Sequence, residues 1–244
     1  MLGCSGTFPG PDSPCSGYLV EHDGFRLVLD LGNGALGQLQ RHCDLRAVDA
    51  VWISHLHADH CLDLVAYSYA LRYHPAGPVR PLPVHGPAGL AERIAAAYEA
   101  APQDGLDAVY DYTVVQPGVA RIGPFEVTTA RVAHPVEAHG VRLSAGGRSL
   151  TYSGDTARSE ALVELARDCD LLLCEASWPS EPAPPPGIHL TGREAGDHAA
   201  RAGAGRLVLT HLMPYADRDG MLAEARETYA GPVELAGCGD VFNV

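Results

Sequence analysis

The chain has 244 residues, of which 46% are hydrophobic, and a formal net charge of −13. This length allows one large domain with a substantial core, and the acidic balance argues against a protein that binds the phosphate backbone of a nucleic acid. With no apolar run of membrane-spanning length, no visible signal peptide and seven scattered cysteines, we expect a cytoplasmic protein with reduced thiols and no membrane partner.

Apolar runs separated by turn signals predict strands along the whole chain. The Asp23-Gly24 pair joins the first two runs into a hairpin. The three runs between 109 and 133 are expected to belong to a second sheet. The expected strands are, in chain order, 17–21, 25–31, 48–53, 82–85, 109–115, 119–122, 125–133, 141–144, 149–153, 171–174, 206–210 and 233–235.

Helical spacing fills the segments between the strands. Thr191 and Glu194 fit a capping box that opens one helix. The Pro-rich stretch 179–187 can be neither helix nor central strand, so we expect an exposed loop bordering the site. Two β-rich halves, each closed by helices, predict a single domain over residues 1–244. The expected helices are 35–42, 61–73, 87–100, 159–167, 191–202 and 217–229.

The densest group of polar residues is His55-x-His57-x-Asp59-His60, which follows the buried strand 48–53. Imidazole and carboxylate groups suit zinc and its neighbours. His55 and His57 alternate along an extended backbone and can face one ion, whereas Asp59 and His60 lie beyond the turn and can face a second. A histidine-rich polar loop is the alternative, but four potential ligands crowded at a strand end favour metal.

Four more polar residues, His134, Asp155, Glu175 and His211, follow the ends of other predicted strands. Taken singly, each is more often a hydrogen-bonded surface residue or a turn residue than a functional group. However, strand ends are where a layered sandwich can bring together side chains from distant parts of the chain. These residues are therefore candidates for the same site as the histidine-rich motif.

Taken together, these residues resemble the metallo-β-lactamase superfamily, whose members fold as a four-layer αββα sandwich with a dinuclear site at one sheet edge. In that resemblance, His134 is similar to the third metal histidine, Asp155 to the bridging carboxylate and His211 to the last ligand. It implies two divalent ions, with zinc expected first and manganese or iron as alternatives. The implied ligands are His55, His57, His134 and Asp155 for one ion, and Asp59, His60, His211 and Asp155 for the other.

The resemblance also implies hydrolysis of a phosphodiester by a hydroxide held between the two ions. The alkoxide that leaves needs a proton. His189 resembles the histidine that ribonuclease Z-like phosphodiesterases place near the scissile bond, and Glu175 resembles the acidic residue that orients it. Without that fold match, His189 reads as a residue that merely precedes a helix. Asp59, beside the hydroxide, is a candidate base.

Within the superfamily, the chain is similar to the atypical class II cyclic-nucleotide phosphodiesterases of actinobacteria, for example in Leu2–Gly6, Ser54–Asp63 and Leu173–Trp178. This similarity implies a small phosphodiester substrate, a 3′,5′-cyclic nucleotide and cyclic AMP first, and a homodimer as a family expectation. The Ser-Gly-Asp-Thr context of Asp155 disfavours a β-lactamase.

A ribonuclease Z-like tRNA endonuclease is the alternative enzyme, and a metal-bearing but inactive sensor is the alternative without activity. The ribonuclease Z branch generally carries a long Gly/Pro-rich arm that grips tRNA. Here only residues 135–154 separate His134 from Asp155, and a predicted hairpin fills them. The acidic charge also disfavours tRNA as a partner.

Trp178 has two readings of equal weight: it stacks on a base, or it packs under the Pro-rich loop. The remaining histidines are expected to be structural residues, one in the middle of a helix and the others in turns or loops. They are His22, His42, His74, His85, His139 and His198.

Overall fold

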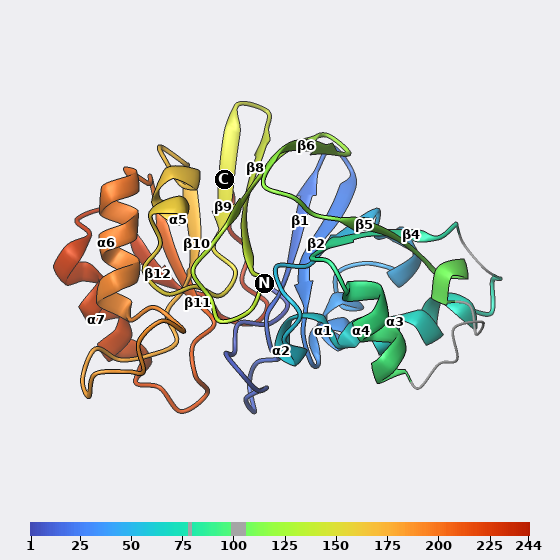
Figure 1. Cartoon of the computed structure of the whole chain (residues 1–244), viewed down its shortest axis with the longest axis horizontal. Coiled ribbons are helices and arrows are strands. Elements are labelled where there is room, and N and C mark those ends of the chain that lie inside the picture. Colours follow the sequence, from blue (N-terminus) through green and yellow to red (C-terminus); the bar gives the residue numbers. More distant parts are fainter. Residues whose placement is uncertain (78–79, 99–105) are drawn as a thin grey trace.

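Residues 1–77, 80–98 and 106–244 are described by a computed structural model of the chain (Figure 1). Two sheets pack face to face, and helices cover the outer face of each sheet (Figure 1). The first sheet has the strand order β1-β2-β3-β4-β5, and the second has the order β12-β11-β10-β9-β8-β7-β6. This arrangement confirms the four-layer αββα sandwich.

The first sheet begins with the antiparallel hairpin of β1 and β2, and its other neighbours pair in parallel. The prediction that the run 109–115 belongs to the second sheet is wrong. This run is β5, which pairs with β4 because the connection through helix α4 (Leu90–Ala97) returns the chain parallel to β4. The strands are β1 Gly17–His22, β2 Phe25–Leu31, β3 Ala50–Trp52, β4 Leu82–Gly86 and β5 Tyr110–Val114.

The second sheet is antiparallel on one side and parallel on the other. The strands from β6 to β9 form an antiparallel meander, whereas those from β9 to β12 pair in parallel. Parallel strands end at the same edge of a sheet, so residues that follow them lie close together. The strands are β6 Gly118–Ile122, β7 Phe125–Arg131, β8 His139–Ala145, β9 Arg148–Tyr152, β10 Leu171–Glu175, β11 Leu207–Thr210 and β12 Val233–Leu235.

The helices follow the predicted pattern, with differences at their ends. The helix expected over 61–73 is α3 (Asp63–Arg72), and a separate short helix, α2 (Ala58–Cys61), precedes it, so Asp59 and His60 lie on a helix rather than before one. The predicted end of the helix 87–100 lies outside the described residues. The helices are α1 Ala35–Leu39, α2 Ala58–Cys61, α3 Asp63–Arg72, α4 Leu90–Ala97, α5 Glu160–Leu165, α6 Gly192–Ala202 and α7 Arg218–Thr228, with short 3₁₀ turns at Leu45–Ala47 and Leu106–Ala108.

Side chains of alternating direction divide the core into three layers. Leu27 and Leu29 of β2 face Leu171 and Leu173 of β10 between the two sheets. The residues between them in sequence point outwards instead, so that Val28 packs against the N-terminal helices. The continuous apolar run of β10 is thus buried on both faces, as its sequence predicts.

Several local predictions can be compared directly with the structure. The capping box of Thr191 and Glu194 at the start of α6 is confirmed. His22 and His139, expected in turns or loops, lie in strands instead, and His85 lies in β4, which matches the predicted strand 82–85. All seven cysteines are free. No helix among the described residues combines the length and the apolar character that crossing a membrane requires.

Candidate metal centre

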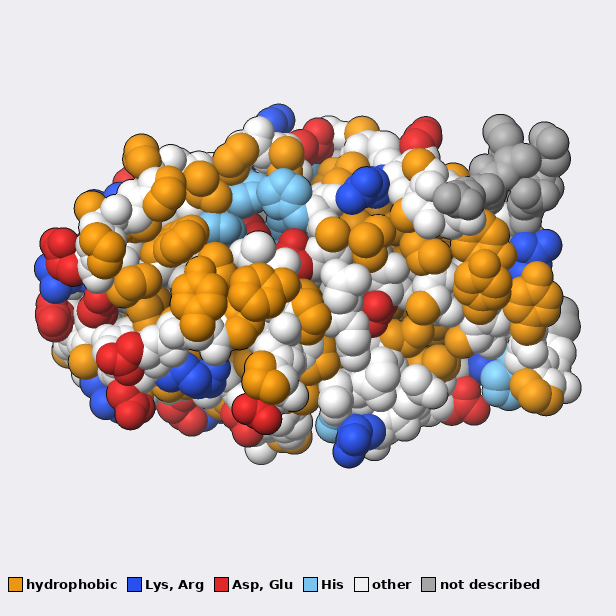
Figure 2. Space-filling model, turned by 90° about the horizontal axis from the view of Figure 1, so that it is seen from below, with side chains coloured by type: hydrophobic (Ala, Val, Ile, Leu, Met, Phe, Trp, Pro, Cys, Tyr) orange, Lys and Arg blue, Asp and Glu red, His pale blue; other side chains and the backbone are white. Residues whose placement is uncertain are grey.

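The predicted ligands come together at one edge of the sandwich. They follow β3, β7, β9 and β11, and two of them lie on the short helix α2, at the lower edge of Figure 1. Figure 2 views this edge from below and shows histidines gathered in a hollow. Their potential ligand atoms form two groups, and within each group the atoms lie within 4.8 Å of one another.

The first set contains His55, His57, His134 and Asp155. Nε2 of His55 is 3.0 Å from Nδ1 of His57, which is 3.3 Å from Nε2 of His134. Oδ2 of Asp155 is 3.6 Å from Nε2 of His55. His55 and Asp155 are buried, whereas His57 and His134 are partly exposed. The first set is therefore open to solvent on one side.

The second set contains Asp59, His60, His211 and Asp155, and all four residues are buried. Nε2 of His211 is 3.1 Å from Oδ2 of Asp59 and 3.3 Å from Nε2 of His60. Oδ1 of Asp155 is 3.2 Å from Nε2 of His60. Because Oδ1 faces the second set and Oδ2 faces the first, Asp155 lies between the two sets.

Each of four histidines uses Nδ1 to bind a protein group outside the site, which leaves Nε2 for the site itself. Such outer contacts fix the orientation of metal-binding imidazoles. The Nδ1 partners are the hydroxyl of Ser54 for His55 at 3.0 Å, Oδ2 of Asp30 for His60 at 2.7 Å, the carbonyl of Ile188 for His134 at 2.9 Å and the hydroxyl of Ser177 for His211 at 2.9 Å.

The charges of the site fit a cation. Oδ1 of Asp155 is buried and has no hydrogen-bond partner among the described residues, and such an oxygen is costly unless something satisfies it. Burial opposes its ionisation, but the charges of His211, His60 and His55 hold the pKa of Asp155 well below its usual range. A buried, ionised and unsatisfied carboxylate oxygen between two groups of imidazoles is the environment that a divalent ion would complete.

The histidines of the two sets differ in charge. Burial, reinforced by neighbouring histidines, holds the pKa of His55 well below its usual value and also lowers the pKa of His57 and His134. At His60 burial acts in the same direction, but the charges of Asp155 and Asp30 outweigh it and raise the pKa well above the usual value. The histidines of the first set are thus neutral ligands. In the second set, the carboxylates around His60 attract positive charge.

Asp59 is a stronger candidate for a ligand than for a base. Burial would raise its pKa, but hydrogen bonds from His211 and His60 outweigh burial and hold the pKa far below its usual range. A carboxylate with so low a pKa binds a proton weakly. The structure places Asp59 beside the site as predicted, and its role as a base stays a prediction.

Asp30 is a functional candidate that the sequence reasoning missed. It is fully buried near the end of β2 and accepts four hydrogen bonds at 2.7 Å, from the N–H and hydroxyl of Ser54, Nδ1 of His60 and the hydroxyl of Tyr152. Its backbone is left-handed, with φ of 53°, which is uncommon for a residue other than glycine. Its sequence position resembles that of the predicted site residues, because Asp30 is a carboxylate at the end of an apolar strand.

His189 and Glu175 form a second arrangement next to the ligands. Nδ1 of His189 is 2.9 Å from Oε1 of Glu175 and 3.9 Å from Oδ2 of Asp155. Burial lowers the pKa of His189, but the charge and hydrogen bond of Glu175 outweigh it and raise the pKa to about 9. His189 is therefore protonated at neutral pH, and its Nε2 has no hydrogen-bond partner among the described residues.

Glu175 connects this histidine to the ligand sets. It is fully buried and accepts hydrogen bonds from the N–H of Thr156 at 2.7 Å and the hydroxyl of Ser177 at 2.9 Å. Ser177 also contacts Nδ1 of His211. Glu175 thus fixes the residue after Asp155, the orientation of His189 and, through Ser177, the ring of His211.

The Pro-rich stretch borders the site as predicted. Most of residues 179–187 are exposed, and the next residue, Ile188, accepts the hydrogen bond from His134. Trp178 is half-buried at the start of the stretch, with its ring 6.4 Å from that of His189. This position beside His189 leaves Trp178 within reach of a ligand at the site.

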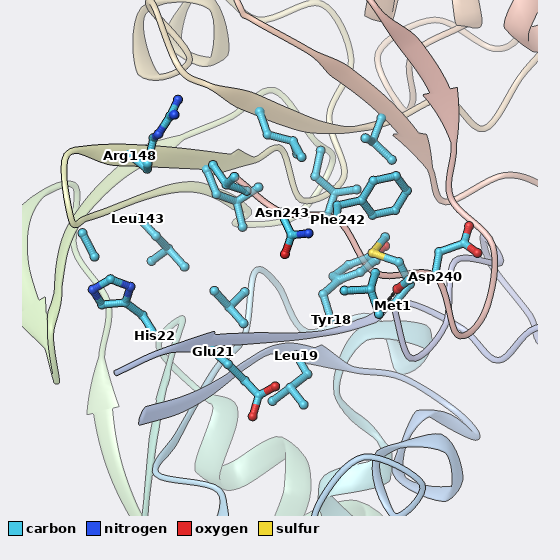
Figure 3. A pocket seen from close by; sticks show the side chains of 18 of the residues that line it. Met1, Tyr18, Leu19, Glu21, His22, Leu143, Arg148, Asp240, Phe242 and Asn243 are labelled. Atoms are coloured by element: carbon cyan, nitrogen blue, oxygen red, sulfur yellow. Dashed lines mark hydrogen bonds between the residues drawn. The ribbon is translucent and has the colours of Figure 1, made fainter. Parts of the chain in front are cut away.

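A cavity of about 330 Å³ between the sheets is separate from the histidines. Figure 3 shows its lining, in which Tyr18 of the first sheet faces Leu143 of the second and Phe242 of the C-terminal segment. None of the candidate ligands, nor Glu175 or His189, lines this cavity. The chemistry therefore belongs to the histidine cluster, and the cavity is a gap in the packing of the sandwich.

Comparisons with known proteins agree with this geometry. Residues 25–212 match the family model of the beta-lactamase superfamily domain. An uncharacterized protein of Mycobacterium leprae is 44% identical, over 100% of this chain and 87% of its own length. The probable metallo-hydrolase YhfI of Bacillus subtilis is 29% identical, over 99% of this chain and 98% of its own.

The crystal structure of YhfI, described as a metallo-beta-lactamase fold protein, superposes with a TM-score of 0.86 over 99% of this chain and 97% of that one, at 28% identity. A ribonuclease Z of Myxococcus xanthus is 29% identical, over 97% of this chain and 94% of its own length. The sandwich described above is thus the metallo-beta-lactamase fold.

Proposed function

Since the chain belongs to the beta-lactamase superfamily, we propose that this metallo-hydrolase cleaves 3′,5′-cyclic nucleotides, with cyclic AMP as the first candidate, to 5′-monophosphates. The observation that carries the proposal is the position of a protonated histidine, His189, next to the carboxylate that the two ligand sets share. This combination provides positive charge for a phosphate and a proton for a leaving alkoxide.

The seven ligand candidates would hold two divalent ions, zinc first, with Asp155 serving both. Divalent ions held there supply positive charge that neutralises phosphoryl oxygens and activates water as a nucleophile. The protein's own part is orientation, since Asp30, Ser54 and Ser177 hold the imidazoles through their Nδ1 atoms. Fixed ligands need no rearrangement when the substrate reacts.

His189 would complete the reaction by protonating the leaving group. The oxygen of a water molecule forms the new bond to phosphorus, and one proton of that water is released to solvent. The bond between phosphorus and O3′ breaks, and O3′ takes a proton from His189, which solvent then reprotonates. Glu175 keeps that proton on the imidazole by its charge and by the hydrogen bond to Nδ1. The proton therefore leaves from Nε2, and the product is a 5′-monophosphate.

The second candidate is a tRNA 3′ endonuclease, favoured by the similarity to ribonuclease Z of Myxococcus xanthus. Two observations favour the small substrate instead. Between His134 and Asp155 the chain forms only the β8–β9 hairpin, which closes at the Gly146-Gly147 turn. The net charge of −13 opposes the approach of a polyanion.

A substrate panel tests the proposal. Protein loaded with zinc or with manganese is incubated with cyclic AMP, cyclic GMP, a cyclic dinucleotide, bis(p-nitrophenyl) phosphate and a precursor tRNA. We expect cyclic AMP to yield adenosine 5′-monophosphate, identified by chromatography. Efficient cleavage of precursor tRNA without turnover of cyclic nucleotides would favour the second candidate. Absence of turnover on every substrate would support an inactive metal-binding sensor.

A further inference from the structure

Two exposed aromatic side chains, Phe8 and Tyr215, lie in contact on one surface. Phe8 is 44% exposed and Tyr215 is 71% exposed. Their ring centroids are 6.2 Å apart, with 36° between the ring planes. Single apolar side chains are common on protein surfaces, but a contacting pair on loops beside a reactive centre is characteristic of ligand binding.

The loop that carries Phe8 is bound directly to the second ligand set. The N–H of Thr7 donates to Oδ2 of Asp59 at 2.9 Å and lies 3.4 Å from Nε2 of His211. Thr7 holds a left-handed backbone, with φ of 64°, to make this contact. Consecutive Cα atoms are about 3.8 Å apart, so Phe8 begins one residue away from a ligand candidate.

The loop that carries Tyr215 is packed against the same segment. It follows His211, and a turn from Met213 to Ala216 presents Tyr215 at its tip. The N–H of Gly6 donates to the carbonyl of Leu212 at 2.9 Å. The two segments approach each other so closely at residue 6 that glycine is required there, because a Cβ on Gly6 would lie 2.5 Å from the carbonyl oxygen of His211. Both rings are thus held in place relative to the metal centre.

Other exposed aromatic residues have partners that explain them without a ligand. Tyr73 is 64% exposed, but its ring stacks on Tyr69, which also stacks on Tyr98. These three tyrosines lie on or beside α3 and α4, on the N-terminal helical layer. Phe8 and Tyr215 contact only each other among the aromatic rings of the described residues, and the loops that carry them border Asp59 and His211 of the second ligand set.

We propose that Phe8 and Tyr215 form a platform on which the planar ring of the substrate stacks while its phosphate lies at the ligand sets. The occupant is a nucleobase, because the flat faces of two uncharged rings match a heteroaromatic ring and carry no positive charge for a phosphate. This inference rests on the proposed function and deepens it. In this proposal, the loops that carry Phe8 and Tyr215 bind the base.

The first test separates binding of the base from chemistry. Phe8→Leu and Tyr215→Leu keep apolar volume but remove the flat face. On cyclic AMP we expect KM to rise by about 5- to 100-fold in each variant, the usual value of a base–aromatic stack, with kcat and metal content unchanged. The rise should be smaller for cyclic UMP, which has a smaller ring to stack. Tyr73→Leu, the matched control from the other exposed aromatic group, should leave KM unchanged.

The second test does not depend on turnover. Tyr215→Trp introduces a fluorescent ring at the platform, and adenosine 5′-monophosphate is titrated into the metal-loaded protein. We expect quenching of this tryptophan, and a binding constant at least fivefold weaker when Phe8→Leu is added. Ribose 5-phosphate, which lacks the base, should not quench.

The two tests distinguish failure of the platform from failure of the proposed function. Hydrolysis of cyclic AMP with KM unchanged in both leucine variants would overturn the platform and leave the function standing. Quenching by adenosine 5′-monophosphate that weakens with Phe8→Leu, in a protein that does not hydrolyse cyclic nucleotides, would support the platform and overturn the function. Absence of quenching, or quenching equal with ribose 5-phosphate, would overturn the platform.

Discussion

The two ligand sets share Asp155 but differ in exposure and in support. In the second set every residue is buried, and a buried carboxylate, Asp30, binds His60. In the first set His57 and His134 are partly exposed, and the support consists of a hydroxyl on His55 and a backbone carbonyl on His134. In the second set His60 is thus held by a charged group inside the core, whereas His55 and His134 of the first set are held by neutral groups.

This difference indicates that the two ligand sets have different roles within one site. Groups buried with ionised partners lose little orientation when a ligand arrives, because the fold already holds them. The partly exposed first set lies where solvent and substrate can reach it. His189 bridges the two regions, since its ring lies 5.5 Å from that of His134 and 5.3 Å from that of His211. We therefore expect substitutions to affect the sets unequally.

Asp155→Ala should have the largest effect on metal content and kcat, because it changes both sets at once. Both sets lose their shared carboxylate, so metal content should fall from two ions per chain and kcat should fall by at least on the order of 10³-fold. Metal analysis of the purified protein and a cyclic AMP assay measure this. Full activity with one ion per chain would contradict a two-ion site.

His189→Ala tests whether the histidine between the sets donates a proton. We expect both ions to remain and kcat on cyclic AMP to fall by roughly 10²- to 10⁴-fold, the usual contribution of a positioned acid. The loss should be much smaller on bis(p-nitrophenyl) phosphate, because nitrophenolate leaves without a proton. Glu175→Gln should show the same pattern more weakly.

Two outcomes would contradict the role of His189. An equal loss on both substrates would indicate a binding role. Loss of one ion would make His189 a ligand, which the grouping of Glu175, His189 and His211 around one point also permits. The assignment of His134 or His211 would then need revision.

The sequence predicted most of the site because its chemistry is local. His55 to His60 lie within six residues, and His134, Asp155 and His211 follow apolar runs that could be recognised as strands. Their convergence then follows from the layered fold. Nothing in a single sequence gives the pairing of distant strands, which is why β5 was placed in the wrong sheet.

Asp30 was missed for a related reason. Its importance comes from a left-handed turn of the backbone and from contacts with Ser54 and Tyr152, which are 24 and 122 residues away in the sequence. The Phe8–Tyr215 pair likewise joins segments from the two ends of the chain. Ligands that belong to a motif are visible in sequence, whereas the residues that orient them are defined by tertiary structure.

Asp30→Asn should weaken the second set more than the first, because Asp30 binds His60 directly but reaches His55 only through the hydroxyl of Ser54. The amide is isosteric but uncharged, and its NH₂ group would face donors that now bind a carboxylate. We expect the affinity for one of the two ions to fall by about 10- to 100-fold, the usual cost of losing such a partner, and the affinity for the other ion to change less. A metal titration followed by calorimetry measures both sites. Asp23→Asn, at an exposed turn, is the matched control and should leave both affinities unchanged.

The smallest expected effect concerns the rate at which the ions leave. A chelator reaches the partly exposed first set directly, but it reaches the buried second set only after local opening of the structure. Mixing the zinc-loaded protein with a chromogenic chelator should therefore release zinc in two phases of equal amplitude, one ion each. Asp30→Asn should accelerate the slow phase more than the fast phase, because Asp30 supports His60 in the buried set directly. His134→Ala should remove the fast phase. A single phase in the unsubstituted protein, or equal acceleration of both phases by Asp30→Asn, would show that the two sets release their ions together and that burial does not distinguish them.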